Sequence, residues 1–180
     1  MLVEYFRKMK GSTQSPPGVS SREILLSWAG GITGIAAVAF LNDHFAAGTG
    51  RPLIIASFGA SAVLIFGAIK SPLAQPRNLV GGHILSALVG VTVFKLLSPW
   101  MWLAAGVAVG TAIAAMHATK TLHPPAGATS LIAVIGGPKI HAMGYSYALM
   151  PVAAGALVLL VVALLFNNLP DTRKYPEYWI

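Results

Sequence analysis

The sequence predicts an all-helical integral membrane protein, and three observations support this fold class. Hydrophobic residues make up 56% of the 180 residues. Charged residues make up only 9%, whereas soluble domains usually carry about 25%. Apolar residues also gather in six runs, and a helix needs about 20 such residues to cross a bilayer. The runs are residues 24–41, 53–69, 79–97, 100–116, 126–136 and 145–166. We therefore predict about six membrane segments in one transmembrane domain over residues 24–166.

The two ends of the chain are predicted to lie outside the membrane. Residues 1–23 and residues 167–180 are each expected to form a cytoplasmic tail. Tyr5, Phe6 and Met9 lie at helical spacing among basic residues, which favours a helix on an anionic membrane surface. A solvated tail is the alternative. The residues that follow are rich in proline and glycine. This composition does not hold a helix, so they are predicted to form a linker.

The fifth apolar run, residues 126–136, is too short to cross a membrane as an isolated helix. About 11 residues rise only ~16 Å, against ~30 Å of hydrocarbon. We expect a half-helix here, or a span that includes extended chain. The surrounding protein must shield this segment, because unpaired backbone is not tolerated in lipid.

A small-residue motif occurs twice and predicts an internal repeat. Gly59-Ala60-Ser61 and Gly127-Ala128-Thr129 are 68 residues apart (127 − 59). The same shift places the third apolar run on the sixth, and the first close to the fourth if residues 42–52 carry extra length. An odd number of crossings per repeat turns the second copy over. We therefore predict two inverted three-helix repeats, at about residues 24–97 and 100–166.

The basic residues predict the orientation in the membrane. With six crossings and a cytoplasmic N-terminus, nine lie inside: Arg7, Lys8, Lys10, Arg22, Lys70, Arg77, Lys120, Arg173 and Lys174. Three lie outside: Arg51, Lys95 and Lys139. This distribution satisfies the positive-inside rule and places both termini in the cytoplasm. We expect the cytoplasmic (inner) membrane of a bacterium. Five crossings, with a re-entrant fifth run, are the alternative.

The charges within the membrane block favour an anion as the ligand. Residues 24–170 contain one acid, Asp43, and six Lys or Arg residues, so the block has a charge of +5. The buried carboxylates that hold Na⁺ or metal cations are nearly absent. No cysteine is present. We predict no metal and no cofactor, and we predict no enzyme because no nucleophile, base and orienting acid can be assembled.

Each copy of the motif is predicted to open a helix inside the membrane. Pro125 suits the first turn, so a helix would start at Ala126 and leave the amides of Ala126, Gly127 and Ala128 free. Such amides attract anions, and Thr129 would add a hydroxyl donor. Gly59, Ala60 and Ser61 would form the second, facing start. The alternative is that these small residues only allow close helix packing.

A cationic entrance is predicted on the inner side. His83, His117 and His123 gather there with Arg77 and Lys120, and imidazoles near their titration range could couple anion movement to protons. Arg77 offers planar donors suited to nitrite, nitrate or carboxylate oxygens. The alternatives are polar helix ends at the membrane interface, favoured for His117, and a lipid-headgroup anchor for Arg77. His44 and His141 are expected in loops.

These motifs resemble the HPP family of integral membrane proteins. The resemblance rests on the segment His123-Pro124-Pro125-Ala126-Gly127-Ala128-Thr129, on Pro76-Arg77-Asn78, Gly81-Gly82-His83 and Phe58-Gly59-Ala60-Ser61, and on the tail residues Asn167-Asn168-Leu169, Arg173, Tyr175-Pro176 and Tyr178-Trp179. It implies nitrite as a candidate substrate, since plastid and cyanobacterial members are associated with nitrite uptake. It also implies four or five spans rather than six. Some bacterial relatives carry cytoplasmic CBS domains, which this sequence lacks.

We predict membrane transport of a small monovalent anion, nitrite first. The predicted substrate-binding residues are Gly59, Ala60, Ser61, Arg77, Asn78, His83, His123, Pro124, Pro125, Ala126, Gly127, Ala128 and Thr129. The expected partners are a small inorganic anion, the lipid bilayer and further copies in a dimer or trimer, and no nucleic acid. A passive anion channel is one alternative. A non-transporting membrane subunit or sensor that binds a partner is another.

Overall fold

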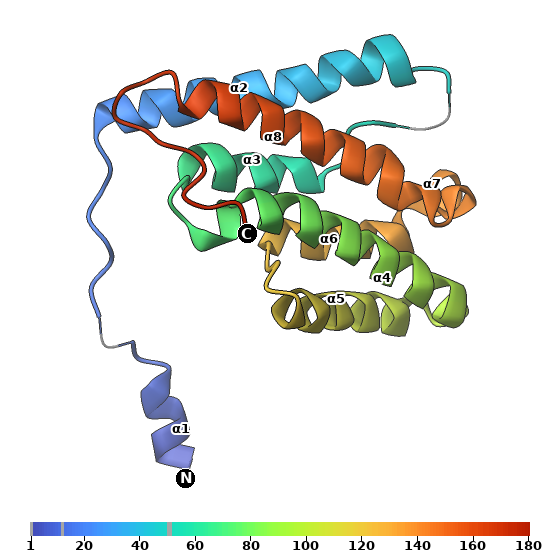
Figure 1. Ribbon diagram of the computed structural model, residues 1–180. Coiled ribbons are helices and arrows are strands. Elements are labelled where there is room, and N and C mark those ends of the chain that lie inside the picture. Colours follow the sequence, from blue (N-terminus) through green and yellow to red (C-terminus); the bar gives the residue numbers. More distant parts are fainter. Residues whose placement is uncertain (1, 12, 50–51) are drawn as a thin grey trace.

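The computed structural model describes residues 2–11, 13–49 and 52–180, and every element within these ranges is helical (Figure 1). Arg51, predicted on the outer side, lies outside the described residues. The α-helices are α1 (Leu2–Lys8), α2 (Ser21–Leu41), α3 (Ser57–Gly67), α4 (Gly82–Leu97), α5 (Met101–Ala118), α6 (Pro124–Ile135), α7 (Gly137–Met143) and α8 (Ala154–Asn167). The π-helices η1 (Asn42–Ala46), η3 (Arg77–Gly81) and η4 (Ala148–Ala153) extend α2, α4 and α8, and the 3₁₀ helix η2 (Pro72–Ala74) precedes η3.

Four helices are long and apolar enough to cross a membrane. They are Ser21–Ala46, Arg77–Leu97, Met101–Ala118 and Ala148–Asn167, the last of which has non-helical backbone at Met150. Two shorter apolar helices, α3 and α6, have 11 and 12 residues. The short fifth segment expected from the sequence is therefore present, as α6. The structure is that of a multi-pass membrane protein, while six crossings and inverted repeats stay predictions.

The short helices lie between the long ones, each with one buried and one exposed face (Figure 1). Helix α4 packs against α5, α6 and η4, and α2 packs against α3 and α8. Helix α3 contacts α6 and so joins the two groups of helices (Figure 1). Glycines permit the closest approaches: a Cβ on Gly90 of α4 would lie 2.5 Å from the carbonyl oxygen of Ser130 in α6. This packing shields one face of each helix that is too short to span a membrane.

Several connections contain more structure than the sequence predicted. Helix α2 continues through η1, where Asn42 Oδ1 accepts hydrogen bonds from the amides of Leu53 (2.8 Å) and Ile54 (3.4 Å). Helix α7 was not predicted. His44 and His141, expected in loops, lie in η1 and α7, where their rings stack on Phe40 and Phe94. The loop prediction was wrong for both histidines. His44 stacks on the preceding helical turn and His141 stacks on a helix distant in sequence, and composition predicts neither contact.

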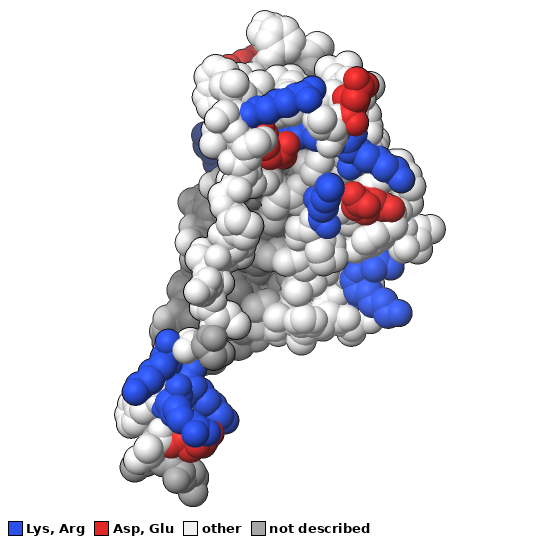
Figure 2. Space-filling view, turned by 90° about the vertical axis from the view of Figure 1, so that its left-hand side faces the viewer, with Lys and Arg blue, Asp and Glu red and all other residues white. Residues whose placement is uncertain are grey.

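Residues 167–180 do not form a free tail but fold back over the bundle end where α2 begins. Arg173 Nη2 donates to Glu23 Oε1 at 2.6 Å, and its Nη1 donates to Asn167 Oδ1 at 3.0 Å. The Tyr175 hydroxyl donates to the Ala74 carbonyl at 2.8 Å, and burial raises the pKa of this phenol. Figure 2 views this end and shows Lys, Arg, Asp and Glu gathered on it and on α1.

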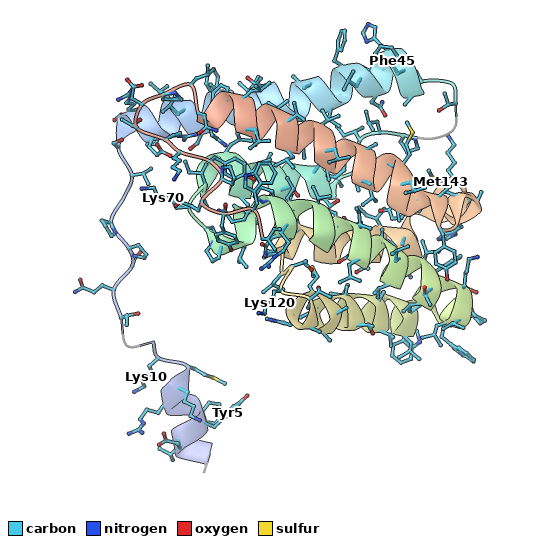
Figure 3. The ribbon with its side chains drawn as sticks, viewed as in Figure 1. Tyr5, Lys10, Phe45, Lys70, Lys120 and Met143 are labelled. Atoms are coloured by element: carbon cyan, nitrogen blue, oxygen red, sulfur yellow. The ribbon has the colours of Figure 1, made fainter. Side chains whose placement is uncertain are left out.

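Helix α1 stands apart from the bundle, as Figure 3 shows for its labelled Tyr5. Its Arg7 and Glu4 form an exposed ion pair at 2.8 Å. Tyr5, Phe6 and Met9 are all exposed, with 58–62% of their surface accessible. An apolar set of side chains beside basic residues suits the predicted surface helix, which stays a prediction.

Candidate functional site

Five buried polar side chains lie together where α3, α4 and α6 meet. We call Ser57, Ser61, His83, His123 and Thr129 the buried cluster; each is at most 1% exposed. Ser57 and Ser61 are four residues apart on α3 and so share one face of that helix. His83 lies in the first turn of α4, and Thr129 lies in α6. His123 is the residue immediately before α6.

The buried cluster forms one continuous chain of hydrogen bonds. Ser61 Oγ lies 2.7 Å from His83 Nε2 and 2.9 Å from His123 Nε2. His83 Nδ1 lies 2.7 Å from Thr129 Oγ1. The Thr129 hydroxyl donates to Ser57 Oγ at 2.9 Å. Two imidazoles and three hydroxyls thus connect three helices, which compensates part of the cost of burying polar groups among apolar ones.

The chain of hydrogen bonds ends on a backbone carbonyl in η2. His123 Nδ1 lies 2.7 Å from the carbonyl oxygen of Leu73 in η2. A carbonyl can only accept, so His123 carries a proton on Nδ1. Asn78 Nδ2 donates to the Leu122 carbonyl at 2.8 Å, which holds η3 beside the residue that precedes His123.

The walls of the buried cluster are apolar or phenolic. The Phe58 ring meets His83 edge-on at a centroid distance of 5.4 Å, and the two imidazole rings lie 5.0 Å apart. The Tyr147 hydroxyl donates to the Thr129 carbonyl at 3.2 Å. Across the described ranges, no group of three or more His, Asp or Glu residues could hold a metal ion. The side chains of the buried cluster can donate and accept hydrogen bonds, and its imidazoles can bind protons.

The two small-residue motifs split between inside and outside. Ser61 and Thr129 point into the buried cluster, whereas Gly59, Ala60 and Ala128 are exposed. Gly127 is half-buried. Gly127 and Ala128 line an apolar cavity of about 510 Å³ between α5 and α6, together with Val109, Ile113, Met116, His117, Leu122, Pro124 and Leu131. Of the motif residues, the two hydroxyls are thus the ones brought together with the histidines.

The prediction of free backbone amides at the helix starts is wrong. Helix α6 begins at Pro124 rather than Ala126, so its first two positions carry no N–H. The Ala126 amide, the next one available, donates to the His123 carbonyl at 2.8 Å. At the start of α3 the Phe58 and Gly59 amides donate to Ile55 and Ala56 carbonyls, at 3.0 and 3.2 Å. Side chains, rather than backbone amides, are therefore the groups these helix starts offer to a ligand.

The remaining predicted residues lie around the buried cluster rather than in it. Arg77 is half-buried, and its buried Nε atom has no hydrogen-bond partner among the described residues. Asn78 Oδ1 is likewise buried without a partner. Pro125 is buried and Pro124 exposed at the start of α6. His117 and Lys120 are exposed at the end of α5 and in the turn that follows (Lys120 is labelled in Figure 3).

Sequence reasoning missed three members of this arrangement. Ser57 was not predicted as a binding residue, although it precedes Ser61 by one helical turn, a spacing that could have indicated it. The Tyr147 hydroxyl and the Leu73 carbonyl had no such signal. Their contacts connect segments 18 and 50 residues apart, and no local pattern specifies such pairs.

The fold and the buried cluster define a multi-pass helical membrane protein with a polar centre. Comparison with known families identifies which one: the chain belongs to the HPP family, whose transmembrane region it matches over residues 16–176. This confirms the resemblance seen in the sequence motifs.

Two relatives are transmembrane proteins of Dictyostelium discoideum. One is 44% identical over 181 residues, covering 99% of this chain and 58% of the relative. The other is 40% identical over 183 residues, covering 99% of this chain and 64% of the relative. This chain thus spans less than two thirds of either relative. No solved structure matches it. The predicted bacterial membrane stays a prediction.

Proposed function

We propose that this protein transports a small monovalent anion across the membrane, with nitrite the first candidate. The observation that carries the proposal is the buried cluster itself, in which Ser61, His83, His123 and Thr129 meet between two short apolar helices. Polar and ionisable groups deep in a membrane protein are costly and mark substrate or ion pathways. A purely structural core at this place would be served by apolar side chains.

Charge favours an anion over a cation at this place. Within the described residues, no carboxylate bonds to the buried cluster, and carboxylates are the usual ligands of Na⁺ and divalent cations. Hydroxyl and imidazole N–H groups are donors suited to nitrite oxygens. Arg77, whose buried Nε has no partner, would supply a planar donor to an anion near the inner surface.

Two inverted repeats are part of the proposal. Ser61 and Thr129, the hydroxyls from the two short helices, are 68 residues apart (129 − 61), the same shift that relates the motifs. The third segment of each proposed repeat begins with a π-helix, η3 before α4 and η4 before α8. Rocking of one repeat against the other would expose the buried cluster to each side in turn. Both termini are then cytoplasmic, and no enzymatic role is proposed.

The test is nitrite flux into liposomes that contain the purified protein. We expect saturable entry above that of protein-free liposomes, which measure the passive entry of nitrous acid. Nitrate, formate and chloride as competitors would rank the anions. The absence of protein-dependent flux for all four anions would contradict the proposal. The control for folding is thermal unfolding of the same protein, measured in detergent and after reconstitution.

The proposed inner entrance has its own test. Arg77→Ala should lower nitrite flux at subsaturating concentration about tenfold, the equivalent of about 1.4 kcal/mol, because the donor that meets the anion is lost. Arg22→Ala, at the exposed start of α2, is the matched control and should leave flux unchanged. Full flux in Arg77→Ala would remove the entrance role while leaving the transport proposal standing.

A further inference from the structure

The hydrogen bonds of the buried cluster can be counted against the protons available to make them. At one end, the Leu73 carbonyl can only accept, so the proton of His123 lies on Nδ1. At the other end, the Thr129 hydroxyl donates to Ser57 Oγ. Thr129 has no second proton, so His83 Nδ1 must donate to Thr129 Oγ1.

Both imidazoles therefore carry their proton on Nδ1, and both Nε2 atoms are bare when the rings are neutral. These two acceptors converge on one hydroxyl, with Ser61 Oγ at 2.7 Å from His83 Nε2 and 2.9 Å from His123 Nε2. Ser61 has one proton and can satisfy only one of them. Its other neighbour, the Ser57 carbonyl oxygen at 3.3 Å, is a further acceptor and supplies none.

One added proton completes the arrangement. With a proton on either Nε2, that ring donates to Ser61 Oγ, and the Ser61 hydroxyl donates to the other ring. Every bond in the chain then has one donor and one acceptor. We propose that His83, Ser61 and His123 form a binding site for a single exchangeable proton, shared between the two imidazoles through the Ser61 hydroxyl.

No other charged group compensates this proton in the part of the chain that the structure describes. The groups facing the histidines are the hydroxyls of α3 and α6, the Phe58 ring, the Leu73 carbonyl and, behind Thr129, the phenol of Tyr147. A lone buried cation is costly, and so is a lone buried anion. Each stabilises the other. Resting on the proposed function, the inference is that one proton accompanies one monovalent anion, which makes transport electroneutral.

The proton site can be measured without transport. In protein labelled with ¹⁵N-histidine and held in lipid nanodiscs, nitrogen NMR distinguishes bare from protonated ring nitrogens. We expect His83 and His123 to hold Nδ1–H throughout and to take up one proton between them as pH falls. In Ser61→Ala the proton affinity of the pair should fall about tenfold, one pH unit in midpoint. Ser130→Ala removes a buried hydroxyl outside the cluster and should change nothing.

Two results would overturn the proton site. One is a pair of histidines that titrate independently and take up two protons, and the other is a Ser61→Ala midpoint equal to the wild type. His83→Gln and His123→Gln assign the signals, and a thermal transition in detergent identifies any variant that fails to fold. Conservative Ser61→Thr keeps the hydroxyl and should restore the shared signature.

Coupling is tested in liposomes with and without an inward proton gradient. We expect the gradient to drive nitrite accumulation in the wild type and in Ser130→Ala, and no gradient-driven accumulation in Ser61→Ala. Saturable nitrite entry that ignores the gradient overturns coupling but leaves the proposed transport standing. If no anion flux is seen but the NMR titration still shows one shared proton, the proton site stands and the transport proposal is contradicted.

Discussion

The Thr129 hydroxyl connects two members of the buried cluster, since its oxygen meets His83 Nδ1 and its proton meets Ser57. Thr129→Val keeps the shape and removes both bonds, which leaves the His83 N–H buried without a partner. We expect a loss of about 1–3 kcal/mol in stability and a large loss of nitrite flux. Thermal unfolding and liposome flux measure the two effects. Thr33→Val on exposed α2 is the control, and normal flux in Thr129→Val would remove the hydroxyl from the mechanism.

The residue types indicated most side chains of the buried cluster, but the prediction of free backbone amides at the helix starts was wrong. Ser61 and Thr129 were predicted from the repeated motif, and His83 and His123 were predicted at an entrance with Arg77 and Lys120. The structure instead buries both histidines beside the two hydroxyls, and it leaves His117 and Lys120 exposed. The amides failed because Pro124 and Pro125 occupy the positions that would have been free, and Ala126 bonds within its own turn. A proline pair starts a helix well but leaves it few donors to present.

At the scale of elements, the contact between α4 and α6 depends on Gly90. An added Cβ would lie 2.5 Å from the Ser130 carbonyl oxygen and 2.8 Å from Ala133 Cβ, so one helix must move. We expect Gly90→Ala to lower stability by about 1–3 kcal/mol through overpacking. Gly106→Ala on α5 meets nothing within 4 Å and should be neutral or stabilising. Thermal unfolding in detergent compares them, and equal transitions would contradict the packing role.

Element lengths were predictable where composition sets them. The apolar runs gave the long helices and the short α6, because hydrophobic length is written in the sequence. Helix α7 and the π-helices were not predicted. The π-helix η4 contains Pro151, which lacks an amide proton, and no periodic pattern announces a widened turn. Which helices pack together depends on contacts distant in sequence, such as Gly90 with Ser130, that no local window contains.

At the scale of the whole molecule, a buried ion pair fastens the C-terminal segment to α2. Arg173 and Glu23 are 2.6 Å apart with side chains 1% and 29% exposed. Because Glu23 is partly exposed, Arg173→Met should cost about 2–3 kcal/mol, less than the 3–5 of a fully buried pair. Arg7→Met breaks an exposed pair at 2.8 Å and should cost about 0–1 kcal/mol. Thermal unfolding tests this, and equal losses would mean that burial adds nothing.

The fastening of the C-terminal segment also reaches the proton on His123. The hydroxyls of Tyr175 and Tyr178 bond the carbonyls on either side of Leu73, at 2.8 and 3.1 Å. The Leu73 carbonyl between them accepts from His123 Nδ1. The C-terminal segment is therefore connected through one short loop to a buried ring of the cluster. Removal of residues 175–180 would therefore release the loop that holds the His123 proton as well as the C-terminal segment itself.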